Sequence, residues 1–112
     1  MALQKENMDR SYLFGRLLAT SDKLEESVLY KRKEERDTNA KKFWNAFVRK
    51  PAKTWAIIRK NLDPYIKQLS GGTKNFYSKL FEEILGKLED VEGFTNSTLD
   101  ENYLLCYYSQ YA

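Results

Sequence analysis

The stretch from Thr38 to Leu69 (TNAKKFWNAFVRKPAKTWAIIRKNLDPYIKQL) constrains the fold most, because it combines an apolar helical pattern with strong positive charge. Its first part has one apolar helical face made by Ala40, Phe43, Trp44 and Phe47. The opposite face carries Lys41, Lys42, Asn45 and Arg49. After Pro51 an apolar stripe restarts with Trp55, Ile58, Leu62, Ile66 and Leu69. On its far side lie Lys53, Lys60 and Lys67, which are spaced by sevens.

The positive charge of this part of the chain is local. Twelve Lys/Arg and four Asp/Glu lie between Lys31 and Lys67, although the whole chain has a net charge of only +3. Residues 1–30 sum to −1 and residues 68–112 to −4. A basic helix face is either an ordinary solvated surface or a site for nucleic-acid phosphates, and the local excess favours the second interpretation.

The periodicity predicts an all-α fold, a single compact bundle of about five helices in one domain over residues 1–112. Residues 1–7 are expected to be disordered. The first helix should begin between Asn7 and Asp9 and run to about Leu29, with a core stripe of Leu13, Phe14, Leu17, Leu18, Leu24 and Val28. Gly15 within it indicates close approach by another helix. Residues 31–37 are either an exposed helix extension or a mobile basic connector.

Capping and breaking residues divide the rest of the chain. Thr38 or Asn39 should cap a helix to about Arg49, and Pro51 fits the first turn of the next one. Pro64 either kinks that helix or starts a short new one with Asp63 as its cap. The element is expected to end at Ser70-Gly71-Gly72, where glycine is a common stop signal.

The C-terminal part of the chain predicts two further helices. A helix over about 73–89 should turn Glu82 and Glu83 outward and bury Phe76, Leu80, Phe81, Ile84 and Leu88. Residues 89–97 are expected to be a loop. Thr98 to Glu101 form a capping box for a last helix to about Gln110, which lies in the core or presents its tyrosines to a partner.

Several function classes are excluded by residue types. The chain has no histidine and one cysteine, Cys106, which rules out histidine-based catalysis, thiolate metal clusters and an internal disulfide. Cys106 is expected to be buried and inert. We predict a protein that is not an enzyme and needs no metal or cofactor. The absence of a long apolar run and of a secretory signal predicts a cytoplasmic protein that does not enter the membrane.

Three motifs resemble one family. YLFGRLLATSDKLEE at 12–26 resembles the Tyr-Leu-x-Gly-Arg-Leu helix near the C-terminus of the large subunit of the type I-C CRISPR surveillance complex (Cascade). The resemblance continues through Asn39, the Phe43-Trp44 pair and Pro51 followed by Trp55. It reappears in LDENYLLCYYSQ at 99–110, where Cys106 and Ser109 replace the family's glycine and histidine. The basic residues 31–36 are peculiar to this sequence.

The resemblance implies a non-catalytic role. A chain that begins MALQKENMDR and holds only this portion looks like the separately produced small subunit, a helical bundle that joins the crRNA-containing complex beside other Cascade subunits and further copies of itself. Such subunits hold the DNA strands of the R-loop through backbone charge. The residues expected to contact nucleic acid are Lys41, Lys42, Arg49, Lys53, Arg59, Lys60, Lys67 and Arg16, although Arg16 could instead form a structural pair. Glu82, Glu83, Glu89 and Asp90 could face a basic neighbour. A stand-alone nucleic-acid-binding regulator and a helical protein-binding adaptor are the alternatives.

Overall fold

The computed structural model describes residues 9–101 and Tyr103 of the 112-residue chain. These residues form five α-helices and no β-strand: α1 (Arg10–Arg32), α2 (Asn39–Lys42), α3 (Trp44–Arg49), α4 (Pro51–Ile66) and α5 (Gly71–Asp90). The predicted all-α class is confirmed. None of the described helices has the length and apolar character that crossing a membrane requires. The predictions for residues 1–7, for Cys106 and for most of the last helix lie outside the described residues.

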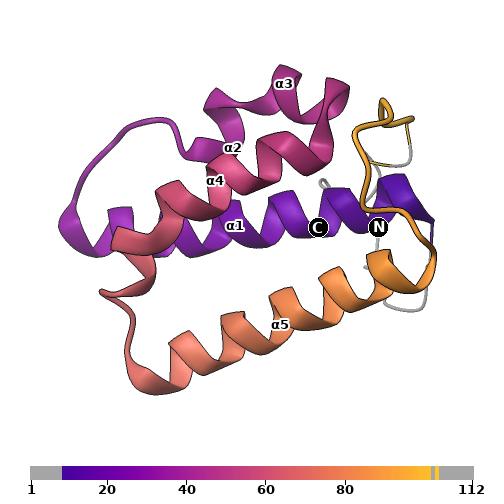
Figure 1. Ribbon diagram of the computed structural model, residues 1–112. Coiled ribbons are helices and arrows are strands. Elements are labelled where there is room, and N and C mark those ends of the chain that lie inside the picture. The colour runs from indigo at the N-terminus through magenta and orange to yellow at the C-terminus, as the bar shows by residue number, and fades with distance from the viewer. Residues whose placement is uncertain (1–8, 102, 104–112) are drawn as a thin grey trace.

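Helix α1 runs through the centre of the molecule, with α2 and α4 packed on one side and α5 on the other (Figure 1). All predicted core residues of α1 are buried. Because helices cover it on two sides, every residue from Ser11 to Asp22 is buried. The interior therefore also holds polar side chains that the apolar stripe does not indicate, among them Arg16, Thr20, Asp22 and Glu25.

The start of α1 is fixed by its cap and by the loop after α5. Asp9 is the N-cap, and its carboxylate accepts a hydrogen bond from the Tyr12 N–H at 3.0 Å. The Arg10 guanidinium donates to the carbonyls of Gly93 (2.6 Å), Thr95 (2.9 Å) and Ser97 (2.7 Å). Partial burial lowers the pKa of Arg10, against the opposing effect of nearby Asp100 and Asp9. Arg10 thus fastens the loop after α5 across the N-terminal end of α1.

Helix α1 ends beyond the predicted Leu29, at Arg32. Lys33 adopts a left-handed conformation (φ 56°, ψ 35°), and its N–H bonds to the carbonyl of Tyr30. The Glu34 N–H bonds to the Leu29 carbonyl at 3.0 Å, which completes a Schellman motif. The basic segment 31–37 therefore has two parts. Lys31 and Arg32 extend the helix, and residues 33–37 are not helical.

The helix predicted to run to Arg49 is two short helices. Thr38 is the N-cap of α2, as one of the two predicted candidates, and its hydroxyl accepts from the Lys41 N–H at 3.3 Å. Phe43 (φ −101°, ψ 15°) leaves helical geometry between α2 and α3. After this break the Trp44 ring packs on Tyr103, with ring centroids 4.9 Å apart, and Phe47 packs edge-on against Phe14 at 5.8 Å.

Helix α4 follows the predicted pattern closely. Pro51 occupies its first turn, and Trp55, Ile58, Leu62 and the following Leu69 are buried. Pro64 lies inside the helix and does not start a new one. The Lys67 N–H bonds to the Asp63 carbonyl at 3.1 Å, and Lys67 keeps right-handed helical angles. Lys67 therefore continues the helical path of Lys53 and Lys60.

Two predictions for α5 are wrong. Ser70-Gly71-Gly72 does not stop the preceding helix; Ser70 is the N-cap of α5, and both glycines lie in its first turn. The Ser70 hydroxyl satisfies an amide of that turn, which explains the start. Phe76 is 60% exposed rather than buried, because the N-terminal end of α5 diverges from α1 (Figure 1). Phe81, Ile84 and Leu88 are buried as predicted, Leu80 is half-buried, and Glu82 and Glu83 face outward.

Candidate nucleic-acid interface

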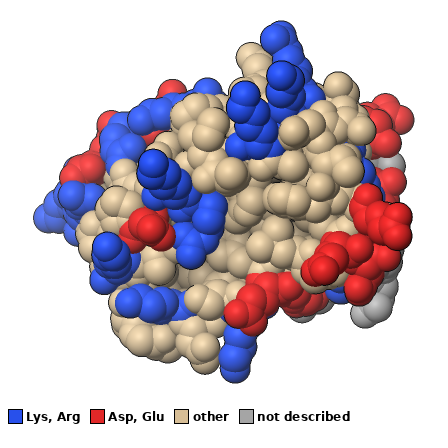
Figure 2. Space-filling model, in the orientation of Figure 1, with Lys and Arg blue, Asp and Glu red and all other residues tan. Residues whose placement is uncertain are grey.

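Seven of the eight predicted nucleic-acid-binding cations are exposed, and all seven lie on or directly after α2, α3 and α4. They are Lys41, Lys42, Arg49, Lys53, Arg59, Lys60 and Lys67. Figure 2 shows Lys and Arg side chains over the upper and left parts of this face, where these helices and the segment after α1 lie. Acidic side chains gather along the lower right, and a smaller number lie among the cations at the left (Figure 2). The local charge excess in the sequence therefore becomes a spatial separation of charge.

Three lysines on and directly after α4 form an exposed row on this surface. Lys53, Lys60 and Lys67 are exposed on the side of α4 away from the buried Ile58 and Leu62. No carboxylate within residues 9–101 forms an ion pair with their ammonium groups. The Lys53 backbone N–H is held by the Asn96 side chain at 2.8 Å, which fixes the start of α4 and leaves the ammonium group at the surface.

Two of the other predicted cations have carboxylate partners. Lys41 Nζ lies 3.3 Å from Glu26 Oε1, and Arg59 Nη1 lies 2.8 Å from Asp63 Oδ1 one turn further along α4. All four side chains are between 41% and 59% exposed. Surface pairs of this kind contribute only about 0.2–1 kcal/mol. Both cations can therefore exchange their carboxylate for a phosphate at little cost.

Arg16 differs from the other predicted cations because it lies in the interior. Its side chain is 2% exposed, and its Nη2 lies 3.7 Å from Glu83 Oε1 of α5. Its Nη1 is buried without a hydrogen-bond partner among the described residues. The central position of α1 explains this burial, which spacing along one helix does not reveal. Arg16 thus forms a structural ion pair with Glu83 and does not belong to the exposed surface.

The basic surface also contains cations that were not among the eight predicted residues. Lys50 is exposed between α3 and α4, and Lys74 shares a depression with Arg59 near the start of α5. Lys31, Arg32 and Lys33 are exposed at the end of α1. Local charge excess is the sequence signal for Lys50. Lys74 carries no such signal, because its place beside Arg59 depends on how α4 and α5 pack.

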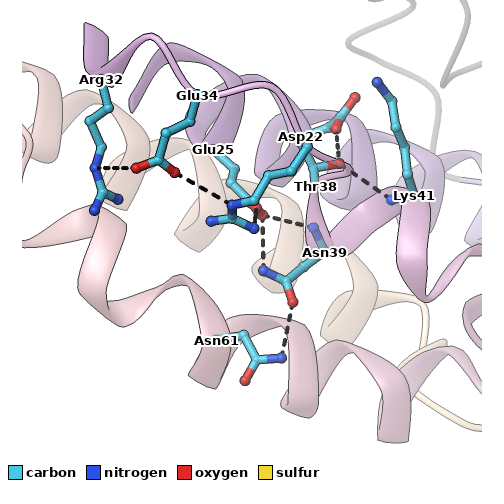
Figure 3. A network of polar contacts seen from close by, with 9 residues as sticks. Asp22, Glu25, Arg32, Glu34, Thr38, Asn39, Lys41 and Asn61 are labelled. Atoms are coloured by element: carbon cyan, nitrogen blue, oxygen red, sulfur yellow. Dashed lines mark hydrogen bonds and ion pairs between the residues drawn. The ribbon is translucent and has the colours of Figure 1, made fainter. Parts of the chain in front are cut away.

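A buried polar network holds the segment between α1 and α2 in place (Figure 3). Glu25 accepts hydrogen bonds from the Asn39 backbone N–H at 2.8 Å and from the Asn39 side chain at 3.0 Å. Asn39 in turn accepts from Asn61 of α4 at 3.0 Å. Asp22 accepts from the Thr38 hydroxyl. Acceptors on α1 thus fix the start of α2, and Asn39 ties it to α4.

Arg36 fixes the middle of the same segment. Its guanidinium lies 3.4 Å from Glu25 Oε2 and 3.6 Å from Glu34 Oε2, and it covers the Tyr65 ring at 5.3 Å. Glu34 also pairs with Arg32 at 3.3 Å. These contacts join residues 32–36 to α1 and α4. The segment is therefore anchored, and its charges have defined positions.

Helix α5 and the loop after it carry exposed carboxylates and border an apolar groove. Glu82, Glu83, Glu89 and Asp90 are exposed along α5. A groove of about 550 Å³ between α4 and the loop after α5 is lined by Trp55, Leu85, Glu89, Glu92 and Phe94. Half-burial raises the pKa of Tyr77 in a second depression between α4 and α5. The described residues contain no cluster of acidic or sulfur ligands that could hold a metal ion.

The model of one protein family matches the chain over residues 1–112, and its description is CRISPR-associated protein (Cas_Csd1). No curated protein and no solved structure matches the chain. The residues that carry the resemblance in the first motif form the centre of the fold, since Tyr12, Leu13, Gly15, Arg16 and Leu17 are all buried. The chain therefore belongs to the Cas_Csd1 family of CRISPR-associated proteins, the family of the type I-C large subunit.

Proposed function

We propose that this protein is the small subunit of a type I-C surveillance complex and stabilises the R-loop by sequence-independent contacts to DNA backbone. Membership of the Cas_Csd1 family supports a place in such a complex. The observation that carries the DNA role is the row of exposed lysines on α4, Lys53, Lys60 and Lys67, which have no carboxylate partner within residues 9–101. The proposal describes a non-catalytic, cytoplasmic protein without a cofactor.

Phosphate contacts explain how such a surface would act. Each lysine that neutralises a phosphate releases condensed counterions, so binding gains free energy and depends on salt. Backbone contacts position a strand but do not read its sequence. In an RNA-guided complex, pairing between guide and target strand supplies the specificity, and the protein stabilises the strands that pairing separates. The contacted strand would be the target strand, the displaced strand or both.

Charge separation supports a second part of the proposal, the assembly of the complex. The exposed carboxylates of α5, Glu82, Glu83, Glu89 and Asp90, would face a basic neighbour, either another subunit or a further copy of this chain. We expect more than one copy in each complex. Mass measurement of the reconstituted complex tests this expectation, and a single copy or none would contradict it.

R-loop formation by the reconstituted, crRNA-loaded complex tests the DNA role. The triple variant Lys53→Ala, Lys60→Ala, Lys67→Ala should enter the complex normally and reduce R-loop yield to a similar extent for any target sequence. Because all three side chains are exposed, their loss should leave the fold intact. If the R-loop yield is unchanged while the variant is fully incorporated, the proposed DNA role is contradicted. A stand-alone regulator would instead bind duplex DNA without the complex and select a sequence.

The apolar groove supports a second candidate function, that of a protein-binding adaptor. It is lined by Trp55, Leu85 and Phe94 together with Glu89 and Glu92, and this lining suits a partner segment that combines apolar and basic side chains. The charge reversal Glu89→Lys, Glu92→Lys should then prevent incorporation into the complex. If incorporation fails with this variant while the lysine variant changes nothing, the adaptor role replaces the DNA role.

A further inference from the structure

Tyr30 stands out because it is a large aromatic side chain with almost no protein around it. It lies in the last turn of α1 and is 85% exposed, the highest value among the large hydrophobic residues that the structure describes as exposed. Three cations follow it directly, Lys31, Arg32 and Lys33. A depression of about 530 Å³ is lined by Tyr30, Lys31, Lys33, Glu34 and Glu35. Tyr30 and two lysines thus border one open site.

The site is held in a defined shape. The Schellman motif fixes the backbone around Tyr30 and Lys33. Beyond it, Arg36 is anchored by Glu25 and by the Tyr65 ring. Glu34 is engaged by both Arg32 and Arg36, at 3.3 Å and 3.6 Å. Its negative charge is therefore compensated, and Lys31 and Lys33 outnumber the remaining carboxylate of the lining, Glu35.

Lys33 occupies a position where glycine folds more easily. A left-handed conformation costs an L-residue roughly 1–2 kcal/mol, and helices that end in this way most often have glycine there. A lysine at φ 56° therefore offers the fold nothing that glycine would not. Lys33 also lines the depression beside Tyr30, which gives the position a use in binding.

We propose that Tyr30, Lys31 and Lys33 bind an unpaired nucleotide of single-stranded nucleic acid. The Tyr30 ring stacks on the base, and the two lysines contact the flanking phosphates. This combination of an aromatic platform with backbone cations is how proteins hold single strands without reading sequence, whereas a duplex keeps its base faces covered. The inference rests on the proposed function and deepens it, since it selects a strand that is not paired in the R-loop.

Binding of the full chain to two fluorescent probes tests the site: a 15-nucleotide oligothymidine and an abasic oligomer of the same length. Tyr30→Ala should weaken oligothymidine binding at least about fivefold, because stacking on one base contributes about 1–3 kcal/mol. It should leave binding of the abasic probe unchanged. Tyr30→Trp should retain oligothymidine binding. Tyr30→Leu should be as weak as Tyr30→Ala, which separates stacking from an apolar contact.

Charge variants test the rest of the site. Lys31→Ala with Lys33→Ala should weaken both probes, and Glu35→Gln should strengthen both, because Glu35 is a carboxylate at the edge of the depression. Unchanged oligothymidine binding by Tyr30→Ala would overturn the stacking site. If the variant Lys31→Ala, Lys33→Ala still weakened binding in that case, the proposed DNA role would stand. If the wild-type chain bound neither probe, both proposals would fall.

Discussion

The charged residues of α1 and those of α4 have opposite surroundings. Asp22 and Glu25 of α1 are fully buried and hold the start of α2 by hydrogen bonds, and Arg16 is buried against Glu83. Lys53, Lys60 and Lys67 of α4 are exposed and unpaired within residues 9–101. Burial therefore separates charges that maintain the fold from charges that are available to a ligand.

This comparison explains where the family resemblance lies. The first family-like motif belongs to α1, whose side chains are enclosed on two sides, so almost any change there meets a neighbour. The exposed lysines tolerate substitution as far as folding is concerned. The first family-like motif thus lies in the interior, and the proposed function rests on the surface.

The largest effect is expected at Glu25. Glu25→Ala leaves the Asn39 N–H and side-chain amide without their buried acceptor and removes one of the two carboxylates that pair with Arg36. We expect a loss of roughly 2–5 kcal/mol in the free energy of unfolding, measured by urea titration. Glu26→Ala is the matched control, because Glu26 makes only a surface pair with Lys41 and should change stability by less than about 1 kcal/mol. Equal effects of the two variants would contradict the division between interior and surface charges.

Gly15 tests how tightly α1 is enclosed. Gly15→Leu introduces a large side chain at a buried position and should cost roughly 1–3 kcal/mol of unfolding free energy. Gly86 of α5 is the control, because a Cβ there meets nothing within 4 Å. Gly86→Leu should be neutral or stabilise the protein by up to about 1 kcal/mol through higher helix propensity. A urea midpoint of Gly15→Leu within error of wild type would mean that nothing packs closely on Gly15.

Arg16→Met should have a smaller effect on stability and none on DNA binding. Methionine fills a similar volume, and Glu83 is exposed and keeps its ion pair with Lys87 at 3.3 Å when Arg16 is lost. We expect a change within about 1.5 kcal/mol of unfolding free energy, in either direction, because apolar replacement of a buried charge is often tolerated. The salt dependence of DNA binding should equal that of wild type. A flatter dependence would show that Arg16 reaches phosphate after all.

The sequence indicates the parts of the fold that follow from periodicity and capping. The α4 stripe, the apolar core of α1, the Thr38 cap and the place of Pro51 are all predictable, because each depends on local spacing or backbone chemistry. Phe43 and Ser70 show the limit. The break at Phe43 has no local signal in the sequence. Glycine is common both after a helix and in turns, so Gly71 alone does not show whether a helix ends or begins there; the Ser70 cap makes it the beginning of α5.

The residues of the candidate interface also fall into those that local spacing predicts and those that packing between distant segments determines. Exposure of Lys53, Lys60 and Lys67 follows from their position opposite an apolar stripe on one helix. Burial of Arg16 does not, because it depends on α5 covering a second face of α1. The anchoring of residues 32–36 by Glu25 and Tyr65 is likewise a contact between distant segments. Spacing within one helix contains no information about either.

The salt dependence of DNA affinity tests the central claim most directly. The affinity of the reconstituted complex for single-stranded DNA is measured over a salt series, with wild-type protein, with the triple variant Lys53→Ala, Lys60→Ala, Lys67→Ala, and with a control of equal charge change, Lys23→Ala, Lys79→Ala, Lys87→Ala. Each phosphate contact contributes about 0.7 to the slope of log affinity against log salt. The α4 variant should flatten the slope by up to roughly two units while stability changes by no more than about 0.5 kcal/mol, and the control should leave the slope unchanged. Equal slopes for wild type and the α4 variant, with both fully incorporated, would contradict the account.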